Sequence, residues 1–201
     1  MARRSDHTRS ELRRMALDAA RDIIGQDGLR GLTTRRLAKA IGYTPGTLYQ
    51  LFDDVDALIV EINMETLDAL YARCHDVDFS VGPEAALMEL AARYAAFTAE
   101  NPRLWNALFE FSLPEGRNLP KQHTIRIVRL LGLAERALAP LFPDDPAGTA
   151  HEAAVLWSCL YGIVSLAASD KLTATETAEA VLHSLVTNYV AGLRFRLGKT
   201  A

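Results

Sequence analysis

Apolar residues recur at helical spacing along the chain, and their pattern divides the first fifty residues into three helices. The segment 12–28 carries an apolar stripe of period 3.6 that ends at its terminal glycine. Thr33 is expected to cap a second, short helix, and Gly42 to form a turn in which a residue without Cβ avoids steric strain. Thr44 followed by Pro45 predicts the start of a third helix, with Thr44 as its cap.

Every long segment beyond Phe52 also has a helical pattern, and none has the alternating pattern of a strand. Asp54 is expected to cap a helix that ends near Cys74, and Pro83 to open the next one. Further helices are expected over 104–109, 121–141, 145–169 and 173–197, with a capping box at 173–176. The helix 121–141 is expected to be amphipathic, with its apolar residues on or near one face: Ile125, Val128, Leu131, Leu138 and Leu141. The sequence thus predicts an all-α fold.

The two short helices on either side of Gly42 form the pattern of a helix-turn-helix, the unit that places its second helix in the major groove of DNA. Any αα-corner with a glycine in its turn would show the same pattern, so the bare motif leaves both interpretations open. The second helix and its entry present hydroxyl, phenol and amide groups, which suit phosphates and base edges. These outward residues are Tyr43, Thr44, Gly46, Thr47, Tyr49 and Gln50. The Gln50 amide has the geometry to pair bidentately with adenine.

The residues around this unit form a specific set of motif positions. They are Ala19-Ala20-x-x-Ile23-Ile24-x-x-x-Gly28, Leu32-Thr33, Leu37-Ala38, Gly42 and Gly46-Thr47-Leu48-Tyr49-x-x-Phe52. This quarter of the chain resembles the N-terminal domain of the tetracycline-repressor (TetR) family. The resemblance implies a dimeric one-component repressor, in which a domain that reads double-stranded DNA is coupled to a C-terminal helical domain that binds an effector.

Carried onto this sequence, the resemblance makes 45–51 the recognition helix. It implies that Thr34 and Arg35 meet the DNA backbone at the start of the preceding helix. The residues that it turns toward the groove are Thr44, Gly46, Thr47, Tyr49 and Gln50. In such proteins the residue at the position of Tyr49 contacts a phosphate more often than a base, and the same is expected here.

One position departs from the family pattern. Members commonly have a lysine that meets phosphate a short polar turn after the phenylalanine, but this chain has Val55 there. The neighbouring Asp53, Asp54 and Asp56 carry charges that repel a DNA backbone. Weaker phosphate anchoring is therefore expected at this turn, offset by the arginine-rich N-terminal arm.

Basic residues are concentrated in the part of the chain that holds the helix-turn-helix pattern. Residues 1–52 hold ten Lys or Arg and five Asp or Glu, a net charge of +5, whereas the rest carries −8 and the whole chain −3. A basic head on an acidic body is typical of a protein that binds nucleic acid with one end. A merely solvated charged helix would not explain why the asymmetry coincides with the motif.

Composition narrows the remaining classes. The 201 residues, 49% of them hydrophobic, suffice for a helix-turn-helix domain at 1–53 and a larger helical domain at 54–201. Cys74 and Cys159 have neither paired nor metal-type spacing, which favours buried packing residues in a reduced, cytoplasmic protein. No apolar run is expected to span a membrane, and no catalytic or metal-binding motif occurs. No cofactor, metal, membrane contact or enzymatic activity is therefore expected.

The last two helices are apolar over more than one stripe, so each must bury more than one face. A self-associating pair would supply the second face, which predicts a C2 homodimer with a four-helix interface; burial in the chain's own core is the alternative. Such a dimer would hold its recognition helices roughly 34–36 Å apart, the spacing of the two halves of an inverted-repeat operator.

The C-terminal bundle is expected to bind an unidentified small-molecule effector of apolar or aromatic character. Candidate lining residues are Tyr94, Phe97, Trp105, Phe109, Trp157 and Tyr161, with Arg126, Arg129 or His123 as polar anchors. Core packing of each aromatic and a solvated position for each arginine are the alternatives. The segment Trp157-x-x-x-Tyr161-Gly162 also resembles the Trp-x-x-x-His-Gly element of one branch of the family, with Tyr161 in place of the histidine.

The sequence leaves open how such a protein would act. Effector binding is expected to favour a dimer whose recognition helices are spaced wrongly for the operator, and repression is favoured over activation. A protein with the same DNA-binding domain and no effector would instead be an architectural or chromosome-associated factor.

Overall fold

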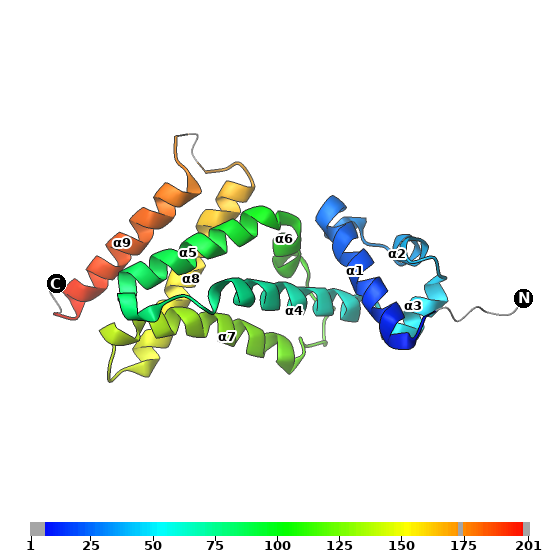
Figure 1. Ribbon diagram of the computed structural model, residues 1–201, viewed down its shortest axis with the longest axis horizontal. Coiled ribbons are helices and arrows are strands. Elements are labelled where there is room, and N and C mark those ends of the chain that lie inside the picture. The colour runs from blue at the N-terminus through cyan, green and yellow to red at the C-terminus, as the bar shows by residue number, and fades with distance from the viewer. Residues whose placement is uncertain (1–6, 173–174, 199–201) are drawn as a thin grey trace, which may run out of the picture. The chain divides into compact units, whose positions relative to one another are not determined.

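The computed structural model describes residues 7–172 and 175–198. This part of the chain is mainly helical and contains no strand (Figure 1). Its α-helices are α1 (Arg9–Asp27), α2 (Thr34–Ala40), α3 (Pro45–Leu51), α4 (Val55–Cys74), α5 (Pro83–Glu100), α6 (Pro102–Glu110), α7 (Lys121–Leu138), α8 (Pro146–Ala168) and α9 (Ala178–Arg196). Short 3-10 helices lie at Leu29–Gly31, Phe79–Val81 and Ala139–Leu141. The prediction of an all-α fold is confirmed.

Contacts divide the chain into two compact units, each with its own hydrophobic core. The first consists of Met1–Thr66 and Asn101–His123, and the second of Leu67–Glu100 and Thr124–Ala201. Helices α4 and α7 each contribute residues to both units. By contacts, α6 and the loop after it therefore belong with the N-terminal helices. The division into a DNA-binding domain at 1–53 and an effector-binding domain at 54–201 concerns function and stays a prediction.

Local capping explains where the first helices begin and end. Thr8 accepts the N–H of Glu11 at 3.2 Å while the Glu11 carboxylate accepts the N–H of Thr8 at 2.7 Å, a capping box that opens α1. Gly28 ends α1 with φ of 72°, and Gly42 makes the turn after α2 with φ of 77°, a region that strains other residues. Thr33 caps α2 through its side chain, as predicted.

Helix α3 begins at Pro45 and Thr44 occupies its N-cap position, both as predicted. The Thr44 hydroxyl makes no capping bond and lies 3.3 Å from the Thr47 hydroxyl instead. Pro45 has no N–H, so the first turn of α3 has one backbone donor fewer to satisfy. The Thr44 side chain is exposed at the entry to the helix.

The core of the N-terminal unit holds α2 and α3 against α1. The small side chain of Ala38, 2% exposed, lets α2 and α3 approach closely across the turn. Ala107 of α6 joins the same core and is fully buried. The other buried members are Leu12, Ala16, Leu17, Ala20, Ile23, Ile24, Leu37, Ile41, Leu48, Leu51, Phe52, Leu58 and Ile62. Helix α3 is thereby fixed against α1 and α2.

In the C-terminal unit α9 packs against α5 and α8, and α5 against α8 (Figure 1). Its buried core members are Val77, Ala86, Leu87, Ala91, Ala137, Leu138, Leu141, Phe142, Ala153, Leu156, Val186, Val190 and Leu193. Asp145 caps α8 by accepting the N–H of Gly148 at 2.8 Å, as predicted. The same unit also buries a carboxylate, that of Glu152.

Three expectations for the C-terminal helices are wrong. On α7, Ile125 and Val128 are 46% and 59% exposed, because the buried stripe of this helix runs through Leu133, Ala137 and Leu138 instead. Helix α9 begins at Ala178, capped by Thr177, and not at the predicted capping box, whose first two residues, 173–174, lie outside the described residues. Cys159 is exposed, whereas Cys74 is buried as expected.

Helix α8 also corrects the expectation about membrane-length segments. Within the described residues, its 23 residues are long and apolar enough, by length and composition alone, to cross a membrane. The helix is nevertheless a packing element of the C-terminal unit, since it contacts α5 and α9 and buries Glu152 against α9. Only 22% of its most apolar stretch is buried, and apolar residues such as Val155 and Leu166 remain exposed on its surface.

The carboxylate of Glu152 predicts an acid-dependent loss of stability. The Tyr189 hydroxyl and the Arg196 guanidinium both donate to it. Burial by itself raises the pKa of Glu152, but these donors outweigh burial and lower the pKa below its ordinary value of 4.5. The ionised group therefore stabilises the folded state above that value, and its contribution is lost as pH falls through the lowered pKa.

We expect Glu152→Gln to lower the free energy of unfolding at neutral pH by about 1–3 kcal/mol. The difference should shrink as pH falls through the lowered pKa of Glu152, because only the wild type loses an ionised group at position 152. Urea unfolding of both proteins across this pH range measures the difference, with Glu135→Gln on α7 as a control of equal charge change. A difference independent of pH would contradict the role given to the ionised carboxylate.

Candidate nucleic-acid interface and effector cavity

Helix α3 and its entry gather six of the predicted DNA-binding residues on one surface. Thr44, Gly46, Tyr49 and Gln50 are exposed, whereas Tyr43 and Thr47 are half-buried. The apolar residues of the same helix, Leu48 and Leu51, point into the core. Tyr49 is 57% exposed, which is unusual for an aromatic side chain and leaves its ring and phenol available to a partner. The arrangement fits a helix that reads a groove with its polar face.

The other two predicted residues lie at the start of α2. Arg35 is exposed and makes no ion pair within the described residues, so its charge is available to a phosphate. Thr34 beside it is half-buried. At the entry to α3, the phenol of Tyr43 lies 2.9 Å from Nδ1 of His7, and the two rings meet edge-on.

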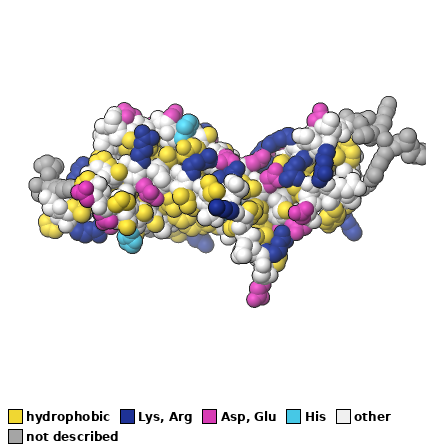
Figure 2. Space-filling view, turned by 90° about the horizontal axis from the view of Figure 1, so that it is seen from below, with side chains coloured by type: hydrophobic (Ala, Val, Ile, Leu, Met, Phe, Trp, Pro, Cys, Tyr) yellow, Lys and Arg dark blue, Asp and Glu magenta, His cyan; other side chains and the backbone are white. Residues whose placement is uncertain are grey.

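Most arginines of α1 are engaged within the N-terminal unit. Arg13 pairs with Glu61, and Arg14 and Arg21 both pair with Glu65 on α4. On the face drawn in Figure 2, Lys and Arg side chains accordingly lie among Asp and Glu rather than as a patch of one sign. The basic head counted from the sequence is thus partly neutralised by its own fold.

Two α1 arginines also bind the end of α3, the predicted recognition helix. Nη2 of Arg9 donates to the carbonyl of Gln50 at 3.0 Å, and Arg13 donates to the carbonyl of Leu51. The guanidinium of Arg13 also stacks on the ring of Phe52, 4.3 Å from its centroid. These contacts satisfy the carbonyls at the end of α3 and hold the helix in place. Arg3 and Arg4 of the N-terminal arm lie outside the described residues.

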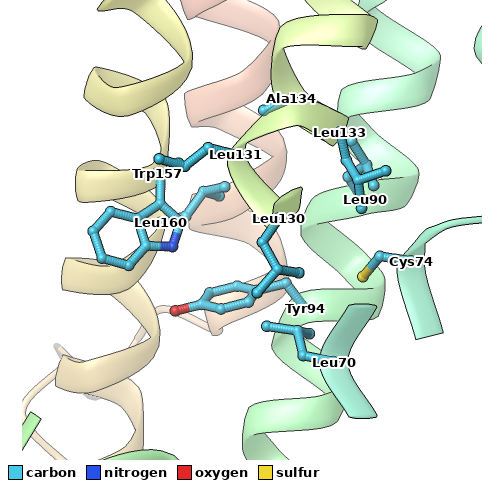
Figure 3. A pocket seen from close by; sticks show the side chains of 10 residues that line it. All are labelled: Leu70, Cys74, Leu90, Tyr94, Leu130, Leu131, Leu133, Ala134, Trp157 and Leu160. Carbon is cyan, nitrogen blue, oxygen red and sulfur yellow. The ribbon is translucent and has the colours of Figure 1, made fainter. Parts of the chain in front are cut away.

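The C-terminal unit contains a small apolar cavity of about 70 Å³ that is partly open to solvent. Helices α4, α5, α7 and α8 supply its ten lining residues, none of them charged (Figure 3). They are Leu70, Cys74, Leu90, Tyr94, Leu130, Leu131, Leu133, Ala134, Trp157 and Leu160. The ring of Tyr94 extends across the cavity toward the helix that carries Trp157 and Leu160 (Figure 3). Such a lining suits an apolar molecule.

The thiol in this wall is unreactive at neutral pH. Burial raises the pKa of Cys74 to about 11, and this effect exceeds the opposing influence of Arg93 and Arg73. The group therefore remains a protonated thiol, which packs as a small apolar side chain rather than acting as a nucleophile.

The structure places the predicted effector residues in several different surroundings. Tyr94 and Trp157 line the cavity, and Tyr161 stacks on Trp157 with ring centroids 6.0 Å apart. Phe97 is buried on α5 but is not part of the lining. Trp105 and Phe109 belong to the other compact unit, where their rings meet edge-on.

The predicted polar anchors are held away from the cavity wall. Arg126 and Arg129 of α7 both bind the carboxylate of Asp68 on α4, at 2.8 and 2.5 Å. Arg129 also stacks over the ring of Tyr71. His123 is buried in the N-terminal unit. No group of three or more potential metal ligands occurs among the described residues.

Comparison with known proteins assigns the chain to a family. Residues 16–62 match the family model described as "Bacterial regulatory proteins, tetR family". Residues 87–189, more than half of the chain, match the model described as "Tetracyclin repressor-like, C-terminal domain". The chain belongs to the TetR family. It is a transcriptional regulator with an N-terminal DNA-binding domain.

Individual TetR-family relatives agree with this assignment. The chain is 26% identical over 183 residues to the uncharacterized HTH-type transcriptional regulator YobS of Bacillus subtilis (strain 168), covering 90% of this chain and 91% of that protein. It is 31% identical over 87 residues to the HTH-type transcriptional repressor KstR2 of Rhodococcus jostii (strain RHA1), covering 42% and 43% of the two chains.

Solved structures share the fold at lower identity. A protein of unknown function from Rhodococcus sp. RHA1 has a TM-score of 0.75 at 20% identity, covering 95% of this chain and 98% of that chain. The TetR-family regulator PfmR of Thermus thermophilus has a TM-score of 0.60 at 18% identity, covering 86% and 97%. Membership of the Trp-x-x-x-His-Gly branch stays a prediction.

Sequence reasoning missed most of the cavity wall of this TetR-family regulator. It favoured aromatic residues, whereas eight of the ten lining residues are Leu, Ala or Cys. The leucines of α7 could have been found from the sequence, because 130–133 holds three leucines in four residues. Such a run places apolar side chains on more than one face of the helix. The other leucines are indistinguishable from core residues in sequence.

A substitution at Gly46 can separate an effect on folding from an effect on DNA binding by the exposed face of α3. A Cβ at Gly46 would meet only the Thr44 hydroxyl oxygen, at 3.8 Å, so alanine fits the fold. We expect Gly46→Ala to leave the protein equally stable or up to about 1 kcal/mol more stable. Its affinity for a cognate duplex should fall by about tenfold or more, because the methyl group occupies space that DNA would fill.

Gly25→Ala on α1 is the matched control, since a Cβ there meets nothing within 4 Å and the site is exposed. Thermal unfolding and fluorescence anisotropy on labelled duplex measure the two properties. Equal DNA affinity for both variants would place Gly46 outside the DNA interface.

Proposed function

We propose that this chain is a repressor that binds an inverted-repeat operator as a homodimer and leaves it when a neutral, apolar effector enters the cavity of the C-terminal unit. The observation that carries the proposal is the pairing, in one TetR-family chain, of an exposed polar reading helix with a separate apolar cavity. An architectural factor would act through DNA binding alone, so the cavity favours the effector-regulated repressor over this alternative.

DNA reading rests on the exposed residues of α3 and on Thr34 and Arg35 at the start of α2. Hydroxyl and amide groups on α3 supply hydrogen bonds to base edges, and Arg35 supplies a charge to the backbone. Because the arginines of α1 are used within the fold, the contacts of α2 and α3 carry a larger share of DNA binding than the sequence alone indicated.

The effector class follows from the cavity wall. A charged ligand would lose its hydration against ten lining residues that offer no countercharge, which costs several kcal/mol or more. Arg126 and Arg129 of α7, the arginines considered as anchors, both pair with Asp68. A neutral molecule with an aromatic or aliphatic body would pack against the leucines and Trp157, and its entry would bias the helices that line the cavity.

Dimer formation is supported by the apolar surface that α8 and α9 leave uncovered. Val155, Leu166 and Phe195 are 36%, 44% and 85% exposed, and a groove between the two helices presents Ile163, Val181 and Leu185. Two copies that pair these helices would bury this surface in a four-helix interface.

A DNA-binding regulator of this kind would act in the cytoplasm.

The test of the repressor role is the transcript level of genes next to the sites that the protein occupies. Deletion of its gene should raise those transcripts, and a neutral apolar compound that releases the protein from DNA in solution should do the same in the wild type. Transcripts that fall on deletion would assign activation instead. A purified protein that stays on DNA with every apolar compound that it binds would favour the architectural alternative.

A further inference from the structure

The acidic turn between α3 and α4 is an electrostatic problem for a DNA-binding protein. Asp53, Asp54 and Asp56 place three carboxylates within four residues, directly after the reading helix. Only residues 52–54 separate the end of α3 from the start of α4, a span of at most ~11 Å. A DNA backbone that flanks α3 would therefore pass close to these charges and be repelled by them.

A distant arginine binds two of these carboxylates. Arg117 lies in the loop between α6 and α7, 63 residues from Asp54 in sequence and in the same compact unit. Its Nη1 donates to Oδ2 of Asp54 at 2.7 Å and to Oδ2 of Asp56 at 3.2 Å. The other oxygen of Asp54 accepts the N–H of Ala57 at 2.7 Å, so Asp54 caps α4 and binds Arg117 at once. These bonds, the Ala57 N–H first and then Arg117, lower the pKa of Asp54 and keep it ionised.

The rest of the Arg117 guanidinium remains available. Nε and Nη2 make no hydrogen bond to the described part of the chain, and the side chain is 42% exposed. A guanidinium has five N–H donors and suits two oxyanions at once, so carboxylates on one edge leave another edge for a phosphate. No other basic side chain pairs with Asp54 or Asp56 within the described residues.

We propose that Arg117 is a positioning residue for DNA binding: it cancels charge at the acidic turn, fixes the first turn of α4 and presents a cation beside the reading helix. The inference rests on the proposed DNA-reading function. It assigns to the loop 111–120 a task in DNA binding, and it explains how the chain tolerates Val55 and three carboxylates at this turn. A role only in tethering the loop is the competing explanation.

The test compares Arg117→Gln, Arg117→Lys and the control Arg73→Gln. Arg73 pairs with Glu100 at 2.8 Å, has a similar exposure of 47% and belongs to the other compact unit. Because both substitutions replace arginine with glutamine, they change the net charge equally. Affinity is measured by fluorescence anisotropy on a duplex selected by the wild type and on an unrelated duplex, over a range of salt concentrations. Thermal unfolding is measured in parallel.

We expect Arg117→Gln to weaken both duplexes by about tenfold near 0.1 M salt, the effect of one phosphate equivalent. The difference should shrink as salt rises, because screening weakens attraction and repulsion alike. Arg117→Lys should recover most of the affinity, and Arg73→Gln should lose none. Adding Asp54→Asn and Asp56→Asn to Arg117→Gln should restore affinity, since asparagine still caps a helix but carries no charge.

An Arg117→Gln protein with wild-type affinity and salt dependence would overturn the inference, whether or not its thermal stability fell. An affinity loss that does not depend on salt would overturn it as well and assign a tether. In both cases the wild type still binds DNA, so the proposed function stands. A wild-type chain that binds neither duplex would overturn both.

Discussion

Replacing Gln50 with alanine is expected to relax the base preference of the protein by about 1–3 kcal/mol, roughly 5- to 150-fold, at one base pair in each half-site. The Gln50 side chain is exposed on α3, and the backbone carbonyl of Gln50 accepts a hydrogen bond from Arg9. The substitution therefore removes an amide that we expect to pair with a base edge and leaves the helix in place. Affinities for duplexes that differ at single positions measure the preference.

Arg35→Ala is the matched comparison, because Arg35 is exposed on the same unit and is expected to contact phosphate. That variant should bind every duplex more weakly and by a similar factor, with a smaller dependence on salt. If Gln50→Ala keeps the base preference of the wild type, the reading face has been placed on the wrong residues of α3.

The second large effect is expected from filling the cavity. Ala134 of α7 is one of the ten lining residues, and Ala134→Phe would put an aromatic ring into the space that an effector needs. We expect this variant to bind the neutral fluorophore Nile red at least about tenfold more weakly than the wild type. It should also stay bound to its operator in the presence of compounds that release the wild type. Fluorescence titration and DNA release measure the two effects.

Val128→Phe is the control, because Val128 lies on the same helix but is 59% exposed and does not line the cavity. Overfilling a core costs about 1–3 kcal/mol, so thermal unfolding must show that Ala134→Phe is folded at the assay temperature. Undiminished Nile red binding by a folded Ala134→Phe protein would show that the cavity is not the binding site.

The helices that could be predicted are those whose ends are decided locally. The hydroxyl of Thr33, the missing N–H of Pro45 and the positive φ of Gly42 act within one turn of chain, so sequence alone placed α2 and α3. The same holds for Asp54 and Asp145, which cap α4 and α8. Thr44 occupies the N-cap position of α3 as predicted, but its hydroxyl lies beside that of Thr47 and makes no capping bond.

Contacts between distant segments left no such signal. The bonds of Arg117 span more than sixty residues, and the loop that carries it reads only as a Gly- and Pro-containing connection. The pairing of α1 arginines with Glu61 and Glu65 is equally invisible, so the charge count overstated how much of the basic head faces outward. Long-range geometry decides which charges a partner meets, and a sequence does not contain it in readable form.

The inward face of α7 was misjudged for a related reason. Its apolar residues surround much of the helix, so periodicity alone did not distinguish the exposed Val128 from the buried Leu133. A helix that lines a cavity with one face and a core with another carries apolar residues on both. It then lacks the single apolar stripe from which periodicity identifies a buried face.

Selection of binding sites from random duplex DNA by the purified full chain, at physiological salt, tests the central claim most directly. The account predicts enrichment of an inverted repeat whose half-sites are centred about one helical turn, or a multiple of it, apart, as two recognition helices in a symmetric dimer require. Enrichment of no sequence, with binding that is uniform and lost as salt rises, would contradict it.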